Sequence, residues 1–258
     1  MISSDFRTEA RRKLSGKWGK SICILIAFIV INFLINLVEG FLPDSMDWIG
    51  QIINIIINVP LSFGLTFAFL KLFKDEEVKS FDFLKLGFSN FGKSWGITFH
   101  TFLKMILPIL LEIFSYVLIV VGLVMYYGST KYTVDISPLS SIPNGVSLAM
   151  LIIGFVLFVI STIWSATKSY YYQLAFFISM ENEDMEPADA VSESEKLMTG
   201  KRASLFCLQL SFIGLAILAA ITFGIGLLWL IPYVQFATIA FYKYAIDKNE
   251  NVEADLDK

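Results

Sequence analysis

Apolar residues along the chain form long continuous blocks, unlike the short alternating segments of a membrane β-barrel. A helix needs about 20 residues to cross a hydrocarbon core of about 30 Å. The blocks reach that length, so we predict an all-α, polytopic membrane protein with six transmembrane helices arranged as three hairpins. The predicted spans are residues 21–38, 49–70, 97–127, 147–167, 205–222 and 227–242.

The last two predicted spans come from one apolar block, 203–246, which is too long for a single crossing. The sequence TFGIG at 222–226 places two glycines in the middle of that block. Glycine adopts the backbone angles of a tight turn at little cost, so the block is divided there.

A similar phrase precedes the first, third and fifth predicted spans: GKWGKSICILIAF from Gly16, GKSWGITFHTFLK from Gly92 and GKRASLFCLQLSF from Gly200. Before each phrase, apolar residues at helical spacing predict an amphipathic helix on the cytoplasmic membrane surface. We expect the glycine to end that helix. We expect six residues to hold the chain at headgroup depth as interfacial anchors: Lys17, Trp18, Lys93, Trp95, Lys201 and Arg202. Chance similarity between basic flanks of membrane helices is the alternative.

This repetition predicts one transmembrane domain, residues 1–246, with hairpin units at approximately 1–73, 74–180 and 181–246. The remaining residues, 247–258, form an acidic cytoplasmic tail without aromatic residues, which we expect to be disordered. No small-residue cleavage site follows the first apolar run, so it is expected to remain as a membrane helix rather than be removed as a signal peptide.

The distribution of basic residues predicts the orientation. If the N-terminus is cytoplasmic, 18 of the 20 Lys and Arg residues lie in cytoplasmic segments. Lys104 lies within the third span, and Lys131 lies in the outer connection at 128–146. Because cytoplasmic segments of membrane proteins are enriched in Lys and Arg, both termini are expected to be cytoplasmic.

Composition excludes several functional classes. The formal net charge is −3, so no basic field suggests a nucleic-acid partner. The two cysteines, Cys23 and Cys207, lie in apolar runs, where they are expected to pack rather than form a disulfide. With a single histidine, the chain has no recognisable metal-ligand cluster, and it has no phosphate-binding glycine motif and no nucleophile-elbow motif. No cofactor or metal is expected, and an enzyme is the weaker class.

Polar residues inside the spans are the remaining candidates for a functional site. They recur at spacings of three and four, which places each set on one helix face. Polar groups in hydrocarbon are costly and usually face a protein interior or a wet cavity. The candidate residues for an intramembrane polar cavity are Asn32, Asn36, Asn54, Asn58, His100, Lys104 and Glu112. In the alternative interpretation the amides join helices, and Lys104 extends to the interface.

The C-terminal half carries further short patterns: LAFF at 174–177, Ala190 with Ser194, LM at 197–198 with Gly200, TFGIG at 222–226, LW at 228–229 and PY at 232–233. Together with Ala10, Leu14, Gly16 and Trp18 near the N-terminus, these resemble the domain-of-unknown-function family 975 of bacterial integral membrane proteins. The resemblance covers most of the chain. It implies a bacterial plasma membrane protein and no particular activity.

Two main functions remain open at this point. The first is a non-enzymatic accessory or scaffold protein that acts through membrane lipids or a membrane-protein partner in envelope maintenance or export. Its docking surfaces would be the charged segments at 74–77 and 181–196, which could equally be ordinary solvated faces. The second is a transporter or lipid-handling protein that uses the polar cavity around Glu112. A third class, an intramembrane hydrolase, would need His100 or Glu112 as a base.

Overall fold

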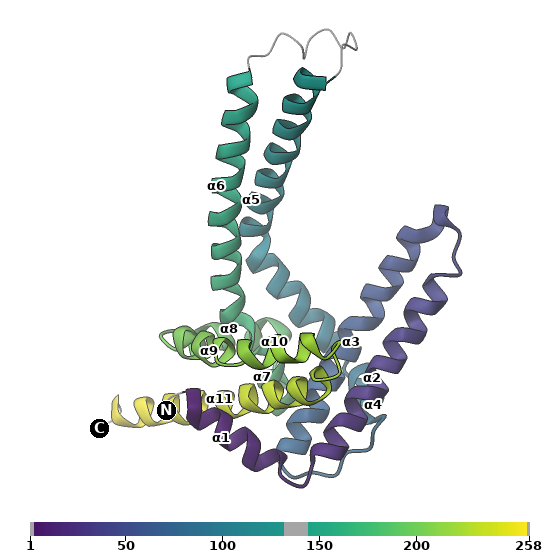
Figure 1. The fold of residues 1–258 in the computed structure, drawn as a ribbon. Coiled ribbons are helices and arrows are strands. Elements are labelled where there is room, and N and C mark those ends of the chain that lie inside the picture. Colours follow the sequence, from purple (N-terminus) through teal and green to yellow (C-terminus); the bar gives the residue numbers. More distant parts are fainter. Residues whose placement is uncertain (1–2, 132–143, 257–258) are drawn as a thin grey trace. The chain divides into compact units, whose positions relative to one another are not determined.

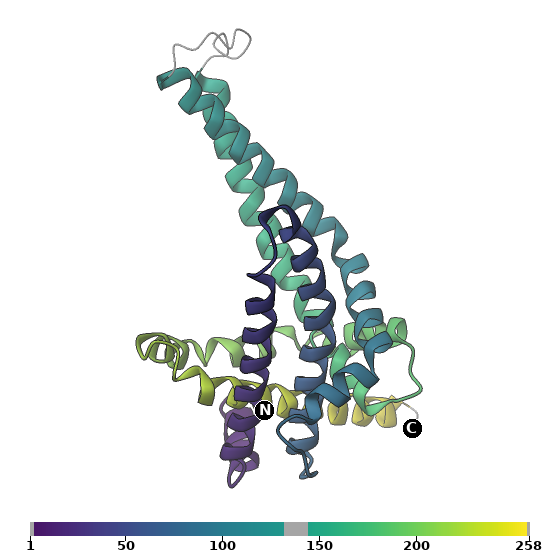
Figure 2. The same ribbon diagram turned by 90° about the vertical axis from the view of Figure 1, so that its right-hand side faces the viewer.

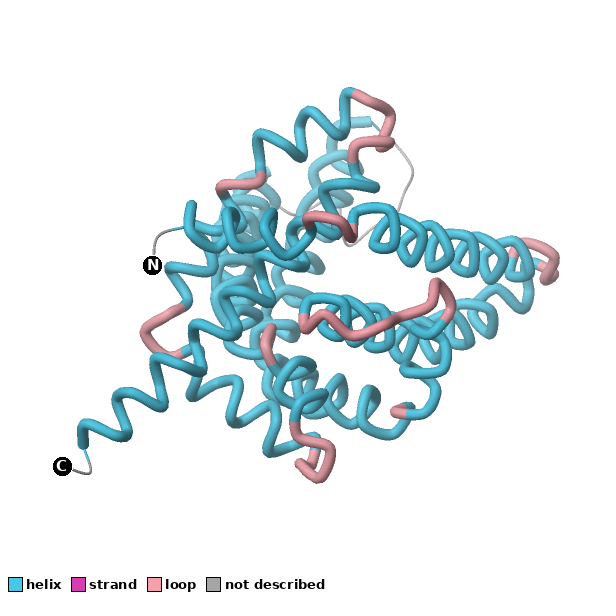
Figure 3. Tube along the Cα trace, turned by 90° about the horizontal axis from the view of Figure 1, so that it is seen from below, coloured by secondary structure: helices cyan, strands magenta, loops and turns pink. Residues whose placement is uncertain are grey.

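The computed structural model describes residues 3–131 and 144–256, and in those ranges all regular structure is helical (Figures 1 and 3). Two compact units are present: Met1–His100 together with Tyr170–Lys258, and Thr101–Ser169. Most of the expected outer connection, 132–143, lies outside the described residues. The helices are α1 (Ser3–Leu14), α2 (Trp18–Glu39), α3 (Asp47–Phe73), α4 (Asp82–Ser89), α5 (Phe91–Lys131), α6 (Asn144–Tyr172), α7 (Ala175–Glu181), α8 (Pro187–Met198), α9 (Arg202–Leu210), α10 (Ile213–Ile221) and α11 (Leu227–Leu256), with a short 3-10 turn at Asp44–Met46.

Five of the described stretches are long and apolar enough to cross a membrane: Trp18–Glu39, Asp47–Phe73, Phe91–Tyr126, Gly145–Glu181 and Arg202–Ile221. The prediction of an all-α chain is therefore confirmed, and the five stretches fit a multi-pass membrane protein. The sixth predicted span, 227–242, is not among them. It lies within α11, where Pro232, Gln235 and Lys243 interrupt the apolar sequence.

Trp95, near the start of α5, compensates for a backbone hydrogen bond that Pro60 removes from α3. Pro60 has no N–H and cannot bond the carbonyl of Ile56 one turn earlier. The indole N–H of Trp95 donates to that Ile56 carbonyl oxygen over 3.3 Å. The carbonyl that proline leaves without its helical partner is thus satisfied by a side chain.

Helices α3 and α4 approach each other backbone to backbone. A Cβ atom placed on Gly64 would lie 2.0 Å from the carbonyl oxygen of Phe83, and one placed on Gly87 would lie 2.2 Å from the carbonyl oxygen of Pro60. Only glycine fits at these two positions, because the atoms in the way belong to the main chain and cannot rotate aside. The pair fixes the short helix α4 against the middle of α3.

Helix α11 supplies much of the buried core of the first unit. Phe236, Ile239 and Phe241 are fully buried there. Helix α1 lies along α11, since the Phe6 ring is 5.5 Å from that of Phe241, while Arg11 reaches Tyr233 at the other end of the same stretch. The apolar face of α1 is therefore covered by the protein itself.

Helix α11 crosses the α2–α3 hairpin at one end of that hairpin (Figure 2). The Tyr233 ring lies 6.4 Å from that of Trp18, the first residue of α2. Less than one turn later, the Phe236 ring lies 5.6 Å from that of Phe73, the last residue of α3. Tyr233 and Phe236 are three residues apart in α11, and they contact the first residue of α2 and the last residue of α3. Helix α11 therefore crosses the ends of α2 and α3 instead of lying along either helix.

The second unit is a pair of long helices, parts of α5 and α6, that lie side by side (Figure 1). Glycines allow the contact, because a Cβ on Gly122 would lie 3.0 Å from the Leu151 side chain and one on Gly154 would lie 2.9 Å from that of Ile119. Apolar side chains such as Ile113 and Phe155 remain exposed on this pair. Such surfaces fit a hydrocarbon environment.

At the C-terminal end, helix α11 continues to Leu256, where the sequence predicted a disordered tail after Asp247. Ala, Glu, Lys and Leu in this stretch favour helix. It also extends a helix that is already packed, so no new nucleation step is needed.

Candidate functional site

Three of the predicted cavity residues meet in a hydrogen-bonded cluster between α2 and α3. The side-chain amide of Asn54 donates to Oδ1 of Asn36 over 3.2 Å and to Oε2 of Glu39 over 2.9 Å. Asn58 donates to the backbone oxygen of Asn54 over 3.0 Å and also to its side-chain oxygen. Glu39 completes the cluster. Its position at the end of α2, three residues after Asn36, was the sequence signal for it.

Asn32, Asn36 and His100 also form hydrogen bonds within their own helices. Asn36 donates to the Asn32 carbonyl over 2.7 Å, and Asn32 donates to the Phe28 carbonyl over 2.9 Å. The ring Nδ1 of His100 lies 2.8 Å from the Gly96 carbonyl oxygen, one turn earlier in α5. Asn32 and His100 therefore satisfy carbonyls of their own helices, while Asn36 does so with its amide nitrogen and joins the cluster through its side-chain oxygen.

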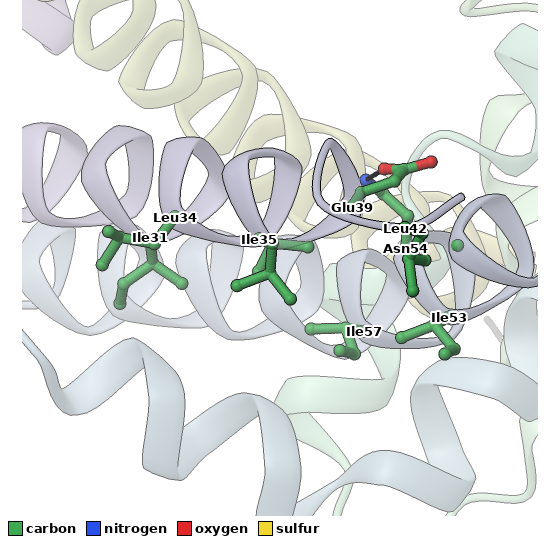
Figure 4. Close-up of a pocket in the computed structure, with 10 residues that line it drawn as sticks. Ile31, Leu34, Ile35, Glu39, Leu42, Ile53, Asn54 and Ile57 are labelled. Carbon is green, nitrogen blue, oxygen red and sulfur yellow. Dashed lines mark hydrogen bonds between the residues drawn. The ribbon is translucent and has the colours of Figure 1, made fainter. Parts of the chain in front are cut away.

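Beside the amide cluster lies a cavity of about 360 Å³ between α2 and α3. Isoleucines and leucines form most of its wall, and Glu39 and Asn54 lie at one end (Figure 4). Gly50 keeps the hairpin closed at that end, because a Cβ there would lie 2.8 Å from Cγ of Glu39. The space is apolar, with a single polar edge, and suits a hydrocarbon group better than a polar solute.

Glu112 belongs to the second unit and has its own polar neighbours. Its carboxylate oxygens lie 3.5 Å from the hydroxyl of Thr162 and 3.5 Å from that of Ser165, both on α6. Lys104, in the same unit, has an exposed side chain. The two hydroxyls were not expected from the sequence, although their spacing of three places them on one face of α6.

The lysine that follows the first glycine in each copy of the repeated phrase donates to a backbone carbonyl at the end of a helix or just beyond it. Nζ of Lys17 donates to the Leu72 carbonyl at the end of α3 over 2.7 Å. Nζ of Lys93 donates to the Glu183 carbonyl just beyond α7. Nζ of Lys201 donates to the Leu197 carbonyl at the end of α8 over 3.1 Å. The last carbonyls of a helix are unpaired and carry partial negative charge, so a cation is favourable there.

The glycines of the phrase follow the same local geometry in two of the three copies. Gly16 has φ +78° and Gly200 has φ +74°, and each lies two residues after the end of a short helix. Gly92 lies inside α5, so the expectation that it ends a helix is wrong. There the chain turns at Asn90, between α4 and α5.

The first and third copies of the repeated phrase, at Gly16 and Gly200, also bury side chains at equivalent positions. Phe6, Ala10 and Leu14 in α1 correspond to Ala190, Ser194 and Met198 in α8, and all six are buried. After the glycine, Ser21 and Ile24 correspond to Leu205 and Leu208, which are also buried. The likeness between these two phrases therefore extends to which side chains face the protein.

Two acidic residues are bound by lysines at the ends of these helices. Asp75 pairs with Lys13 over 2.8 Å and also with Lys17, and hydrogen bonds from these two amines lower the pKa of the Asp75 carboxyl to about 2. Glu181 pairs with Lys74 over 2.5 Å and with Lys243 over 2.7 Å. Lys74 and Glu181, expected to belong to docking surfaces, thus bind each other.

The other expected interfacial residues have protein partners. The guanidinium of Arg202 lies over the Tyr171 ring, 4.1 Å from its centroid. Trp18 is beside Tyr233, and Trp95 bonds the Ile56 carbonyl as described above. Burial lowers the pKa of the Lys201 amine, and the charge of Lys248 adds to the effect.

Tyr233 also receives two arginines of α1. Nε of Arg11 donates to the Tyr233 hydroxyl over 2.8 Å, and Nε of Arg7 donates to it over 3.4 Å. Arg7 further donates to the carbonyl of Ser211, in the break between α9 and α10, over 3.3 Å. Sequence reasoning missed this site. Its only local signal was the spacing of four between Arg7 and Arg11.

The described residues offer contacts for charged and for apolar groups. No group of three His, Cys, Asp or Glu side chains among the described residues is placed to hold a metal ion. Helices of this length and polarity, with charged residues bound at their ends, define a multi-pass α-helical membrane protein.

The chain belongs to the family described as "Protein of unknown function (DUF975)", whose family model matches residues 1–250. The resemblance noted from the sequence is thereby confirmed. No curated protein and no solved structure matches the chain.

Proposed function

We propose that the chain is a non-enzymatic accessory protein of the bacterial plasma membrane that acts through lipids or a membrane-protein partner. Support comes from how its charges are used. Lys17 and Lys201 bind carbonyls at helix ends, Lys93 binds a carbonyl just beyond one, and Asp75 and Glu181 bind lysines. The large apolar side chains of the long helices stay exposed, so the surface offered to other molecules is mainly a surface for lipid or for another membrane helix.

The basic residues place both termini in the cytoplasm in this proposal, as expected from the sequence. Helices α2, α3, α5 and α6 cross the membrane, and the α9–α11 segment lies along the cytoplasmic face. The crossing of α11 over Trp18 and Phe73, at one end of the α2–α3 hairpin, supports this placement.

The length of Arg202–Ile221 would also permit a crossing. However, Ser211 is near the middle of that stretch, and its carbonyl accepts a hydrogen bond from Arg7. If the stretch crossed, the Arg7 guanidinium would lie near the bilayer centre, where a charge costs several kcal/mol. A position at the membrane surface avoids that cost.

Purification from native membranes in a mild detergent, followed by mass spectrometry of proteins and lipids, tests the proposal. A second protein at stoichiometric amount, or a retained lipid class, is expected. A protein that extracts without detergent, with neither partner nor lipid, would overturn the proposal.

A second candidate, a transporter or lipid-handling protein, is favoured by one observation. Glu112 faces Thr162 and Ser165 on α6, and both helices of this pair lie in stretches apolar enough to cross a membrane. An ionisable residue within a membrane segment usually serves transport or proton transfer. Glu112→Gln should then abolish function in cells that depend on the protein, whereas Glu77→Gln, at an exposed cytoplasmic position, should not. Full function of Glu112→Gln would exclude this candidate.

A further inference from the structure

A groove of about 250 Å³ lies between the start of α2 and the α10–α11 hairpin. Trp18, Leu218, Trp229 and Tyr233 are among the residues that line it. Leu218 is 59% exposed and Trp229 is 50% exposed, so the groove opens to the surroundings of the protein. Tryptophan and tyrosine favour the boundary between membrane and water, which is the depth expected for the first residue of α2.

Two positive charges are placed next to this groove. The Arg11 guanidinium lies 5.7 Å from the centroid of the Tyr233 ring, and the Arg7 guanidinium lies 5.3 Å from that of the adjacent Phe212. Their hydrogen-bond acceptors are the Tyr233 hydroxyl and the Ser211 carbonyl, which are neutral. Among the described residues neither arginine forms a salt bridge, whereas the neighbouring Arg12 pairs with Glu9 and Lys13 pairs with Asp75.

Beyond the groove, the hairpin tip is strongly apolar and exposed. Ile221 is 69% exposed, Phe223 is 99% exposed and Ile225 is 61% exposed. A tip of this kind inserts readily among acyl chains. The groove thus lies between a part of the protein suited to hydrocarbon and a pair of uncompensated guanidinium groups.

We propose that this groove binds one anionic glycerophospholipid of the cytoplasmic leaflet. One acyl chain lies along Leu218 and Trp229, and the phosphate lies at Arg7 and Arg11. Guanidinium groups recognise phosphate through paired, charge-assisted hydrogen bonds, and the site's charge favours anionic over zwitterionic headgroups. The proposal rests on the proposed function, because it assigns a lipid class to a protein that acts at the membrane.

Native mass spectrometry of the full chain in detergent tests this site, with phosphatidylglycerol and phosphatidylcholine supplied in equal amounts. We expect the first lipid to be retained at least about tenfold more than the second, a difference of about 1.4 kcal/mol. The double variant Arg7→Gln with Arg11→Gln should remove that preference. Arg12→Gln, on the same helix but paired with Glu9, is the matched control and should keep it.

A second variant tests the groove without removing a hydrogen bond. Leu218→Trp fills the groove at an exposed position, so the fold should tolerate it, and binding of phosphatidylglycerol should fall at least about tenfold. Glycerol phosphate without acyl chains should not displace the bound lipid, which distinguishes a lipid from free phosphate. Equal retention of the two lipids, or unchanged selectivity in both variants, would overturn the site but leave the proposed membrane function intact. Loss of all lipid binding together with extraction free of the membrane would overturn both.

Discussion

The indole N–H of Trp95 donates to the carbonyl oxygen of Ile56, which is the carbonyl that Pro60 leaves without a helical partner. Trp95, expected to hold the chain at headgroup depth, thus also supplies the hydrogen bond that α3 lacks at Ile56. Proline within membrane helices is tolerated where other groups satisfy the freed backbone. The Trp95 hydrogen bond makes Pro60 in α3 compatible with a low-dielectric surrounding.

Replacing the indole should therefore destabilise the protein only while Pro60 is present. Trp95→Phe should lower the free energy of unfolding by about 1–2 kcal/mol, because one carbonyl loses its donor. In the Pro60→Ala background the alanine N–H can bond Ile56, and the same change should cost about 1 kcal/mol less. A double-mutant cycle on thermal unfolding in detergent measures the coupling. Additive effects would show that the Trp95 bond does not compensate for the proline.

Gly64 should not accept a side chain. Gly64→Ala places a methyl group 2.0 Å from the Phe83 carbonyl oxygen, and the backbone cannot move without separating α3 from α4. We expect a loss of about 3 kcal/mol or more. Gly19→Ala is the control, since a Cβ there meets nothing within 4 Å in α2, and it should be neutral or stabilise by up to about 1 kcal/mol. Similar unfolding temperatures for the two variants would contradict the close packing of α3 on α4.

The glycines of the repeated phrase should respond differently to the same substitution. Gly16→Ala and Gly200→Ala should each cost about 1–2 kcal/mol, because their φ angles of +78° and +74° disfavour side chains. Gly92→Ala lies in helix with no neighbour within 4 Å, so it should be neutral or slightly stabilising. Unfolding temperatures of the three variants measure this. An equal cost at all three positions would argue against the helical geometry at Gly92.

Asp75 should make stability depend on acid pH. Its pKa in the folded protein is about 2, below the ordinary value of 3.8, so its stabilising effect is present above about pH 4 and disappears as the pH falls toward 2. The charge-free variant Asp75→Asn should unfold at a lower temperature than the parent at pH 6, and the difference should shrink to nothing near pH 2. Asparagine tolerates the φ of +67° at this position, so backbone strain is not introduced.

The control for this experiment is Asp184→Asn at an exposed loop position, which should leave the unfolding temperature unchanged. A difference between parent and Asp75→Asn that persists at pH 2 would mean that the ion pairs with Lys13 and Lys17 do not stabilise the fold.

The location of the hairpin tip can be tested by labelling. In a chain with Cys23 and Cys207 replaced by alanine, Phe223→Cys should resist a membrane-impermeant thiol reagent applied outside intact cells. Gly40→Cys lies in the α2–α3 connection, which the proposed topology puts outside the cell, and it should react. Labelling of position 223 from outside would restore the six-span topology.

The long helices could be predicted from the sequence because they depend on local apolar length alone. Helices α2, α3, α5 and α6 contain the first four predicted spans. The placement of α11 could not be predicted, since Phe236 and Phe241 are equally apolar whether they face lipid or protein. The spacing of Asn54 and Asn58 indicated a polar face, and the spacing of Asn36 and Glu39 indicated another, but only the fold shows that the two faces meet. The pairing of Arg7 with Tyr233 joins residues 226 positions apart, which no local pattern contains.

The packing of α1 along α11 has a consequence for biosynthesis. Phe6, on the apolar face of α1, leaves the ribosome 235 residues before Phe241, the residue of α11 whose ring lies 5.5 Å from its own. At about 5–20 residues per second, that interval lasts roughly 12 to 47 seconds. During that time α11 does not yet cover the apolar face of α1. This face and the three consecutive basic residues in the last turn of α1 favour binding to the membrane surface. The core of the first unit can pack only after α11 has been synthesised, so this packing follows insertion of the hairpins.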